Sequence, residues 1–448
     1  MKLPLPPPDP TGLLSKLQPE TLARLIEIPQ TAGAGRYLHW DELRHRAPPE
    51  GFTLEEWWLS IWLGRAPAFK PLPLLDNRGQ SFRFAMPEPV QIHLHHIDRD
   101  AAGQIRAPVG APIHENRERY LLHSLIEEAI TSSQLEGAST TRRVAEAMLR
   151  EGRRPRDRSE AMIFNNYATM AHIRSLRNEP FTPERILELH RMLTADTLDD
   201  PADAGRLRHS DDVRVVDNRT GTVLHEPPHW EELPARLERL CAFANADEHA
   251  EPFVHPVVRA ILLHFMIGYD HPFVDGNGRT ARALFYWAMA RSGYWLMEFL
   301  SISQFLRQAP AQYVTAYLHT ETDNGDTTYF VLHQLDIIRK AIEALYAYLA
   351  RKTHEQKDAE RLLASAPALR SRLNHRQVTL LTHALRNPGE AYRVSAHQQY
   401  HSVVYQTART DLIDLETLGF LERFKQGAAF VFYAPADLKE RIERAARG

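Results

Sequence analysis

The sequence contains a single cysteine, Cys241, among its 448 residues. One thiol cannot form an intrachain disulfide, and a reducing compartment is compatible with this composition. The chain also lacks a run of about 18 uncharged apolar residues, the length that a membrane-spanning helix needs. Prolines interrupt the first ten residues, MKLPLPPPDP, which do not resemble a secretory signal. We therefore expect a cytoplasmic protein that does not enter the membrane.

An excess of charge of one sign is also missing. Lys and Arg number 54 and Asp and Glu number 57, which gives a net charge of -3 at pH 7. This balance argues against a protein that coats nucleic acid or is attracted to a membrane surface. Hydrophobic residues make up 43% of the chain and charged residues 25%, as is usual for a globular protein, and the length allows two or three domains.

The pattern along the chain predicts a mainly α-helical protein in three parts. Residues 1–109 are expected to form an accessory region of mixed structure. The first 35 or so residues are Pro-rich and are expected to be poorly ordered. Segments Tyr37–Arg46 and Leu54–Leu63 read as helices and Val90–Leu94 as a β-like run. The tryptophans of the second segment are expected in a core or an interface; they are Trp57, Trp58 and Trp62.

Residues 110–350 are expected to form an all-helical domain with one β-hairpin. Apolar residues at helical spacing predict helices within 114–150, with a break at Gly137, and then at 159–199, 230–245, 254–269, 279–290 and on to about 350. The Arg-rich interval 150–158 reads as a solvated loop, because no aromatic residue interleaves it. In residues 213–225, β-branched runs flank a turn in which Gly221 supplies a positive φ, which is the signature of a hairpin.

Residues 360–448 read as a separate winged helix-turn-helix domain. Helices are expected at 375–386 and 402–418, followed by a β-hairpin. Residues 371–448 hold 11 Lys or Arg and 8 Asp or Glu, a net charge of +3. The expected recognition helix 402–418 offers Arg409 against Asp411, Asp414 and Glu416. Because phosphate binding needs clustered cations, we favour a protein-interaction or dimer role over nucleic-acid binding.

The residues that carry chemistry lie in the run HPFVDGNGRTAR at 271–282. Gly276 and Gly278 allow a tight turn and the close approach of a ligand to the backbone. The helix that begins near Asn277 directs its unpaired N–H groups at the loop, which creates an anion site suited to phosphates. Arg279 and Arg282 lie on one helical face and can add charge-assisted bonds to phosphate oxygens.

Two further side chains complete the predicted site. Asp275 offers a hard oxygen ligand for Mg²⁺ held between phosphates. His271 precedes the loop and can act as a general base for an attacking hydroxyl.

Rival interpretations of this loop fail on spacing. A Walker loop needs Gly-Lys-Ser/Thr, a Rossmann loop needs a third glycine after a strand, and HExxH, the zinc signature, is missing from the sequence. An EF-hand would place Phe273 and Leu284 at the first and twelfth ligand positions, where neither side chain can bind calcium.

The run 271–282 matches the motif HPFx[DE]GNGRxxR of the Fic family at every fixed position. The resemblance covers roughly residues 110–350 and implies a protein adenylyltransferase that moves AMP from ATP onto a Ser, Thr or Tyr hydroxyl of a target protein. It also implies a Fic-type helical fold with a hairpin flap. One Fic branch transfers phosphate instead and carries Lys at the position of Gly278, so this glycine favours AMP transfer.

The resemblance assigns roles residue by residue. His271 would deprotonate the target hydroxyl and Asp275 would hold Mg²⁺, while Phe273 would be an apolar anchor. The nucleotide site would comprise Asp275, Gly276, Asn277, Gly278, Arg279, Thr280, Ala281 and Arg282. The flap, residues 213–225, would hold a target segment by strand pairing along Val213, Arg214, Val215 and Val216.

A second resemblance concerns regulation. In the segment TSSQLEG at 131–137, Ser132, Glu136 and Gly137 match the [ST]xxxE[GN] inhibitory motif of self-restrained Fic proteins. Glu136 would pair with Arg282 and occupy the group that should hold the γ-phosphate, which would misalign ATP. In some relatives this glutamate supports removal of AMP from the target, and homodimers that bury the inhibitory face are common.

Several interpretations stay open at this point. His190, His255 and His264 lie in expected helices and are read as structural, while Tyr313 and Tyr317 could wall an adenine pocket or belong to the core. A second function is a DNA-binding regulator whose Fic domain senses nucleotide, although a sensor has no need of His271 as a base. The target protein and the role of residues 1–109 are not indicated by the sequence.

Overall fold

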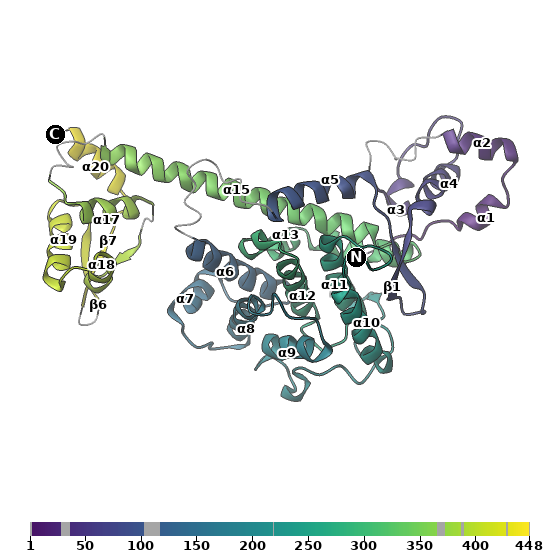
Figure 1. Cartoon of the computed structure of the whole chain (residues 1–448), viewed down its shortest axis with the longest axis horizontal. Coiled ribbons are helices and arrows are strands. Elements are labelled where there is room, and N and C mark those ends of the chain that lie inside the picture. The colour runs from purple at the N-terminus through teal and green to yellow at the C-terminus, as the bar shows by residue number, and fades with distance from the viewer. Residues whose placement is uncertain are drawn as a thin grey trace. The chain divides into compact units, whose positions relative to one another are not determined.

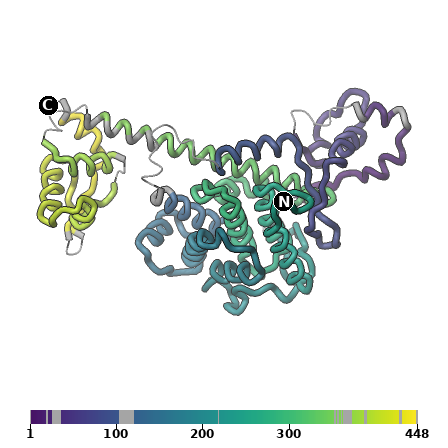
Figure 2. Tube along the Cα trace, viewed as in Figure 1, coloured from purple at the N-terminus to yellow at the C-terminus, as the bar shows by residue number. Residues whose placement is uncertain are grey.

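The computed structural model describes residues 2–27, 36–102, 117–217, 219–364, 372–386, 389–426 and 429–447. The chain divides into two compact units (Figure 1). The helical unit comprises Met1–Arg106 and Asn116–Leu345, coloured purple to green along the trace of Figure 2. The C-terminal unit comprises the described residues from Tyr346 onward.

Short helices and one hairpin form the first part of the helical unit. They are α1 (Pro10–Leu14), α2 (Pro19–Glu27), α3 (Trp40–Leu43), α4 (Leu54–Arg65), η1 (Ala66–Ala68), β1 (Lys70–Leu75), β2 (Ser81–Phe84), α5 (Glu88–Ile97) and η2 (Asp98–Ala102). Trp57 and Trp58 are buried in one apolar core with Leu25, and Trp62 is partly buried against it, so the expected core position of the tryptophans is confirmed. A reciprocal capping box between Thr53 and Glu56 fixes the start of α4.

Two expectations for this part were wrong. The segments 10–14 and 19–27 are helical, because their leucines can pack on α4 and so gain order despite the prolines; residues 28–35 lie outside the described ranges. Val90–Leu94 belongs to helix α5 and not to a strand. Pro89 stands in the first turn of α5, where its fixed φ favours a helix start, and Val90 and Leu94 then fall on the buried face.

Helices build the remainder of the helical unit. Its further elements are α6 (Arg117–Leu135), α7 (Arg142–Glu151), α8 (Arg158–Ile173), α9 (Pro183–Thr194), η3 (Pro201–Asp203), β3 (Val215–Val216), β4 (Val223–His225), η4 (Trp230–Glu232), α10 (Leu233–Asn245), α11 (Pro256–Asp270), α12 (Asn277–Arg291), η5 (Trp295–Phe299), α13 (Ile302–Gln308), α14 (Pro310–Thr322) and the first part of α15 (Thr328–Ala364), which continues into the C-terminal unit after Leu345. The mainly helical fold class is thus confirmed, and the predicted break at Gly137 is present, with a φ of 92°.

Helices α11 and α12 lie at the centre of the unit and pack against each other (Figure 1). α11 is apolar on nearly every face, and its side chains from Val257 to Ile267 are buried, with the exception of Arg259. α12 packs on α11 and also on α6, α8 and α9. The loop that joins the two buried helices therefore has little freedom to move, and this loop carries residues 271–276.

The N-terminal elements are built into the same unit. The backbone N–H of Arg83 donates to the carbonyl of Gly325 at 3.0 Å, and the N–H of Thr327 donates to the carbonyl of Arg83 at 2.9 Å. The Tyr37 hydroxyl donates to Asp326 at 2.6 Å. These bonds tie residues 37–85 to the turn between α14 and α15, so contacts do not separate the accessory region from the helices; the sequence boundary near residue 110 stays a prediction.

The C-terminal unit has its own apolar core. Its elements are α17 (His375–Arg386), β5 (Ala391–Tyr392), α18 (Val394–His401), α19 (Tyr405–Thr417), β6 (Glu422–Gln426), β7 (Ala429–Tyr433) and α20 (Leu438–Arg447), with the strands ordered β5-β7-β6. The helix expected at 402–418 begins at Tyr405, because Ser402 takes a left-handed φ of 51° that ends α18. The winged helix-turn-helix assignment stays a prediction.

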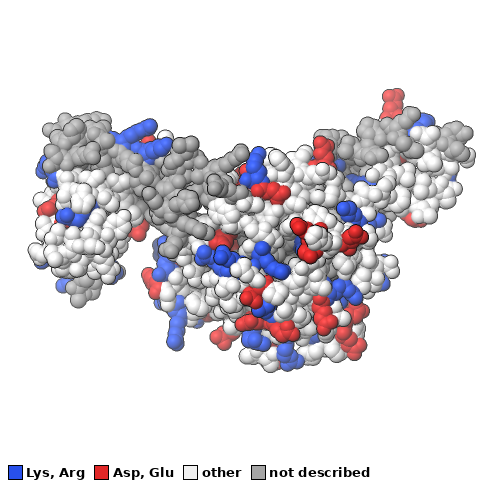
Figure 3. All heavy atoms as spheres, viewed as in Figure 1, with Lys and Arg blue, Asp and Glu red and all other residues white. Residues whose placement is uncertain are grey.

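Acidic and basic side chains are mixed over the face of the helical unit shown in Figure 3. Within the described ranges, no helix is long and apolar enough to cross a membrane.

Candidate active site

The loop after α11 is held in one conformation by its own side chains. His271 closes α11 in the left-handed region, with a φ of 43°. Asn277 makes two reciprocal bonds: its Oδ1 accepts from the N–H of Phe273 at 3.0 Å, and its Nδ2 donates to the carbonyl of Phe273 at 2.8 Å. Gly276 has a φ of 85°, and a methyl group there would lie 2.7 Å from Thr194 Cγ2. Glycine is therefore required at this turn.

His190 supports the loop through a hydrogen bond and a ring contact. Its Nδ1 accepts from the N–H of Gly205 at 2.9 Å, so its Nε2 carries the proton and donates to the carbonyl of Asp275 at 2.9 Å. The ring stacks on Phe273 with centroids 3.7 Å apart. Burial lowers the pKa of His190 to about 4, so the ring stays neutral. His190 is structural, as expected, but it acts on the motif loop itself.

The orientation of His271 leaves one ring nitrogen available as a base. Its Nδ1 lies 2.9 Å from the carbonyl of Gly268, which can only accept, so Nδ1 carries the proton and Nε2 has the lone pair. Burial lowers the pKa of His271 below its ordinary value of 6.5, and the charge of His225 acts in the same direction. The ring is thus neutral at pH 7 and can accept a proton.

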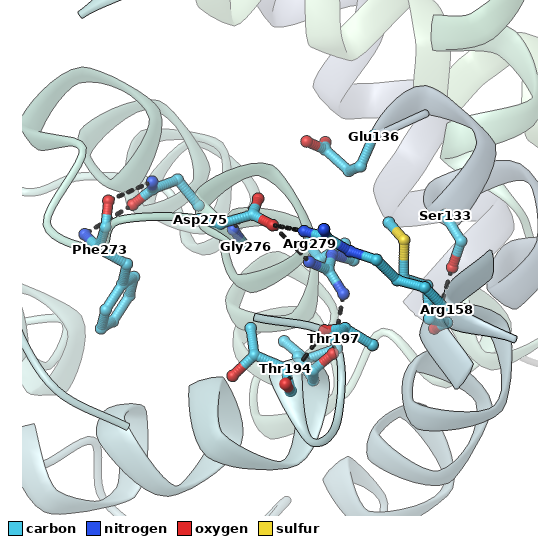
Figure 4. Close-up of polar contacts among 12 residues, drawn as sticks. Ser133, Glu136, Arg158, Thr194, Thr197, Phe273, Asp275, Gly276 and Arg279 are labelled. Atoms are coloured by element: carbon cyan, nitrogen blue, oxygen red, sulfur yellow. Dashed lines mark hydrogen bonds and ion pairs between the residues drawn. The ribbon is translucent and has the colours of Figure 1, made fainter. Parts of the chain in front are cut away.

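Arg279 is fully buried beside Asp275. Its Nη1 donates to the carbonyl of Leu193 at 2.8 Å, whereas Nε and Nη2 have no hydrogen-bond partner among the described residues. Asp275 points toward this guanidinium (Figure 4), with Oδ2 3.7 Å from Nη2, and Arg158 reaches the same oxygen at 3.6 Å. Buried donors without hydrogen-bond partners are rare, and in this structure Nη2 faces the carboxylate of Asp275.

Arg282 is bound by the end of α6. Its Nη2 donates to Glu136 Oε1 at 2.8 Å and to the Ser132 carbonyl at 3.1 Å, and its Nε donates to Ser132 Oγ at 2.8 Å. Burial opposes the charge of Arg282, but the charge of Glu136 raises its pKa overall. A methyl group on Gly278 would collide with the Glu136 carboxylate, so this glycine allows α6 to approach α12. A methyl group added at Gly137 would meet no atom within 4 Å, so this glycine serves only to end the helical turn with its positive φ.

A cavity of about 230 Å³ brings together His271, Asp275, Arg282 and Glu136, whereas Arg279 and His190 are buried and do not line it. Its lining residues are Glu136, Val215, Leu224, His225, Gly268, Tyr269, His271, Val274, Asp275, Gly276, Asn277, Gly278, Arg282, Tyr313, Val314, Tyr317, Leu318 and Glu321. Tyr313 and Tyr317 thus belong to the cavity wall. Thr280 and Ala281 are fully buried away from it, and the Thr280 hydroxyl donates to the Gly276 carbonyl at 2.9 Å.

The donors at the cavity fit a magnesium ion held mainly by phosphate. Asp275 is partly exposed at the cavity wall and supplies a carboxylate. The described part of the chain has no cluster of three or more His, Cys, Asp or Glu side chains that could form a protein cage for a metal. Mg²⁺ typically binds through one or two carboxylates plus substrate phosphates, which matches this arrangement.

The hairpin of residues 213–225 borders the cavity. Its paired part is shorter than predicted, with Val215 opposite His225 and Val216 opposite Val223, so Val213 and Arg214 precede the strand. Gly221 has the expected positive φ, 69°, while Asn218 of the predicted turn lies outside the described residues. Val215 lines the cavity and Val216 is exposed, and β3 pairs with β4 in a two-stranded sheet, so no other described strand covers its second edge.

Sequence reasoning missed three residues near the site. Arg158 was assigned to a solvated loop, but it begins α8 and reaches Asp275. His190 contacts the loop, and His225 joins the flap to α11. Each bond spans at least 44 positions of the chain, so no local pattern could reveal it.

Comparison with known proteins bears on this region of the chain. Residues 180–289 match the model of the Fic/DOC family. The chain is 29% identical over 196 residues to the proteins named protein adenylyltransferase Fic of Drosophila sechellia and Drosophila melanogaster, and the match covers 44% of this chain and 37% of each relative. The chain therefore spans little more than a third of the length of these relatives.

A solved structure shares the fold. The crystal structure of a Fic family protein from Desulfovibrio desulfuricans G20 aligns with a TM-score of 0.50 at 18% identity, over 78% of this chain and 96% of that chain. The motif at 271–282 lies inside the matched range 180–289, and the predicted resemblance is confirmed. The chain therefore carries a domain of the Fic/DOC family.

Proposed function

We propose that the chain transfers AMP from ATP to a Ser, Thr or Tyr hydroxyl of a protein, and that Glu136 restrains this reaction. Support comes from the loop at 271–276, from the Fic/DOC match and from relatives named protein adenylyltransferase. Because the match covers 37% of those relatives, the residues of this site must carry the proposal.

The carrying observation is the state of His271. Its Nε2 holds a lone pair at the cavity wall, because Nδ1 donates to the Gly268 carbonyl at 2.9 Å. In the proposed reaction the target oxygen attacks the α-phosphorus, the bond to pyrophosphate breaks, and the hydroxyl proton moves to Nε2 of His271. A neutral histidine in hydrogen-bond reach of the hydroxyl suits this proton transfer.

The start of α12 and two arginines are proposed to hold the phosphates. In the described structure no side chain caps the first amides of α12, and Gly276 and Gly278 add no side-chain atoms in front of them. The guanidinium of Arg279 has unpaired donors, and Arg282 is proposed to take the outer phosphate once Glu136 leaves. Mg²⁺, when bound by Asp275 and the phosphates, would neutralise charge on the departing pyrophosphate.

The bond between Glu136 and Arg282 supports the proposed restraint. While Glu136 Oε1 accepts from Arg282 at 2.8 Å, this arginine is not free for a γ-phosphate. ATP would then bind with its α-phosphorus out of line with the attacking hydroxyl, and misplacement of this kind lowers rates strongly. De-AMPylation with Glu136 is a finer proposal, and its signature is loss of AMP removal in Glu136→Gln.

The test uses α-labelled ATP, Mg²⁺ and a cell lysate. Wild type, Glu136→Gly and Glu136→Gly with His271→Ala are compared by label on protein. We expect strong labelling only by Glu136→Gly. Labelling that survives His271→Ala would overturn the catalytic assignment, and equal labelling by wild type and Glu136→Gly would overturn the restraint.

One observation favours the alternative of a DNA-binding regulator that senses nucleotide. Asp411, one of the acids counted against phosphate binding, is buried inside the C-terminal unit, while Arg409 is exposed on α19. The exposed side of α19 is therefore less acidic than its sequence suggests. Absence of labelling by every variant, together with a salt-dependent gel shift on duplex DNA, would favour this alternative.

A further inference from the structure

His225, at the end of β4, is buried between α11 and α14 with both ring nitrogens bonded. Nδ1 lies 2.8 Å from Glu321 Oε2, and Nε2 lies 2.6 Å from the carbonyl oxygen of Tyr269. A carboxylate and a carbonyl can only accept hydrogen bonds. Both nitrogens of His225 must therefore donate, which makes the ring an imidazolium.

The surroundings of His225 suit a positive charge. Burial opposes the charge, but the hydrogen bond and charge of Glu321, the Tyr269 carbonyl and the charge of Asp270 together raise the pKa of His225 above 6.5. The carbonyl end of α11 adds the negative end of a helix dipole. Tyr269, with its ring centroid 4.5 Å from that of His225, and His271 are further titratable groups around this ring, and Arg236 is bound to Asp270 at 2.8 Å.

His225 and His271 are anchored to neighbouring atoms. His271 Nδ1 donates to the carbonyl of Gly268, and His225 Nε2 donates to the carbonyl of the next residue, Tyr269. His225 is also the strand partner of Val215. His225 therefore connects three elements. Its backbone pairs with β3, and its ring bonds the last turn of α11 and α14.

Asn77, in the N-terminal hairpin, makes two further hydrogen bonds that attach the end of the flap and the last turn of α11. The N–H of Asn77 donates to the Tyr269 hydroxyl at 3.0 Å, and its Nδ2 donates to the carbonyl of Glu226 at 3.3 Å. These bonds fasten the residue after His225, but they carry no charge. The charged bonds of His225 are therefore the part of the attachment that can be switched by a single proton.

We propose that His225 is a positioning residue whose imidazolium fastens the flap to α11 and α14 and so holds the edge of β3 in register with His271. The proposal rests on the proposed function, in which this edge holds the protein substrate. Loss of the proton removes one donor, and the flap is released from either Glu321 or Tyr269. The fastening is complete below pH 6.5 and is lost as pH rises through the raised pKa of His225.

The first measurement does not depend on activity. Hydrogen exchange of the flap amides is followed from about pH 6 to pH 9 and corrected for the intrinsic rate, and the NMR titration of the His225 ring is recorded in parallel. In wild type we expect flap protection to fall as His225 loses its proton. Since hydrogen bonds to charged groups change equilibria roughly tenfold to a hundredfold, the fall should be at least about tenfold.

Three variants sharpen the test. His225→Phe keeps a ring but has no donor, so its flap protection should be low and independent of pH. Glu321→Gln keeps an acceptor without charge, so it should fold normally, lower the pKa of His225 and move the loss of protection to lower pH. His229 is an exposed histidine four residues after His225, and the control variant His229→Phe should give the same flap protection as wild type.

Activity provides the second measurement, in the Glu136→Gly background. Removal of the His225 charge should raise the pKa of His271, so His225→Phe should shift the acid limb of self-labelling to higher pH, which a merely structural residue would not do. Equal flap protection in wild type and His225→Phe at every pH would overturn the proposal. If flap protection depends on pH and on His225 as expected, but no variant labels protein, the role of His225 in holding the flap stands and only the proposed transferase function is overturned.

Discussion

At the scale of single residues, the proton balance of His271 decides when the site can work. The ring acts in its neutral form, and burial lowers its pKa below 6.5. On the acid side, the labelling rate of Glu136→Gly should therefore fall only below pH 6.5. Initial rates of labelling against pH check this, and a limb centred above pH 6.5 would contradict it.

Gly276 offers a second prediction at this scale. Gly276→Ala adds a left-handed residue, which costs roughly 1–2 kcal/mol. It also adds a methyl group 2.7 Å from Thr194 Cγ2, so the loop must shift. Gly293→Ala is the matched control, because its φ of 83° is similar and no atom lies within 4 Å of the added methyl.

Thermal unfolding and binding of labelled ATP distinguish the two glycine variants. Both should lose stability, Gly276→Ala by more, and only Gly276→Ala should lose nucleotide binding. Equal binding by the two variants would show that the turn at Gly276 is not needed for the anion site.

At the scale of elements, Arg236 joins three segments that surround the site. From α10 it donates to Asp270 at the end of α11, and it also bonds the carbonyls of Leu75 and Asp76 in the N-terminal hairpin. Burial raises the pKa of Asp270 despite this arginine, so the carboxylate depends on its partner. Arg236→Ala should cost about 3–5 kcal/mol, as expected when one member of a buried pair is removed.

Chemical denaturation measures the loss caused by Arg236→Ala. Arg239→Ala, on the exposed side of the same helix, should change the stability by less than about 0.5 kcal/mol. If the two variants lose equal stability, the buried pair does not hold these elements together.

Much of this element framework could be predicted, because it follows from local patterns. The apolar residues at helical spacing within 254–269 identified α11. The strand predicted at Val90–Leu94 is a helix, because β-branched and apolar residues suit both strands and helix faces, and packing decides between them. The roles of His190 and Arg158 depend on distant partners that only the fold brings near.

At the scale of the whole chain, the two units have separate cores and should lose structure independently. In the C-terminal unit Asp411 accepts from Arg376 at 2.7 Å and from His397 at 3.1 Å, and its side chain is buried. Asp411→Ala should destabilise this unit by about 2 kcal/mol or more. Labelling by the Glu136→Gly site in the helical unit should not change.

Calorimetry should show this as a lowered transition for one unit only. Glu416→Ala, which removes a more exposed pair with Arg423, is the control and should cost about 1 kcal/mol or less. A parallel loss of labelling in Asp411→Ala would mean that the units are coupled.

The bond between Glu136 and Arg282 joins two helices of one unit in one chain, so dilution cannot weaken it. An equilibrium constant of the folded protein describes how often this bond is closed. By thermodynamic reciprocity, the factor by which ATP favours opening of the bond equals the factor by which opening raises the affinity for ATP. ADP lacks the phosphate proposed for Arg282 and gains nothing from the opening. The ratio of ATP to ADP affinity in wild type, set against that ratio in Glu136→Gly, therefore measures the fraction of molecules in which the bond is closed.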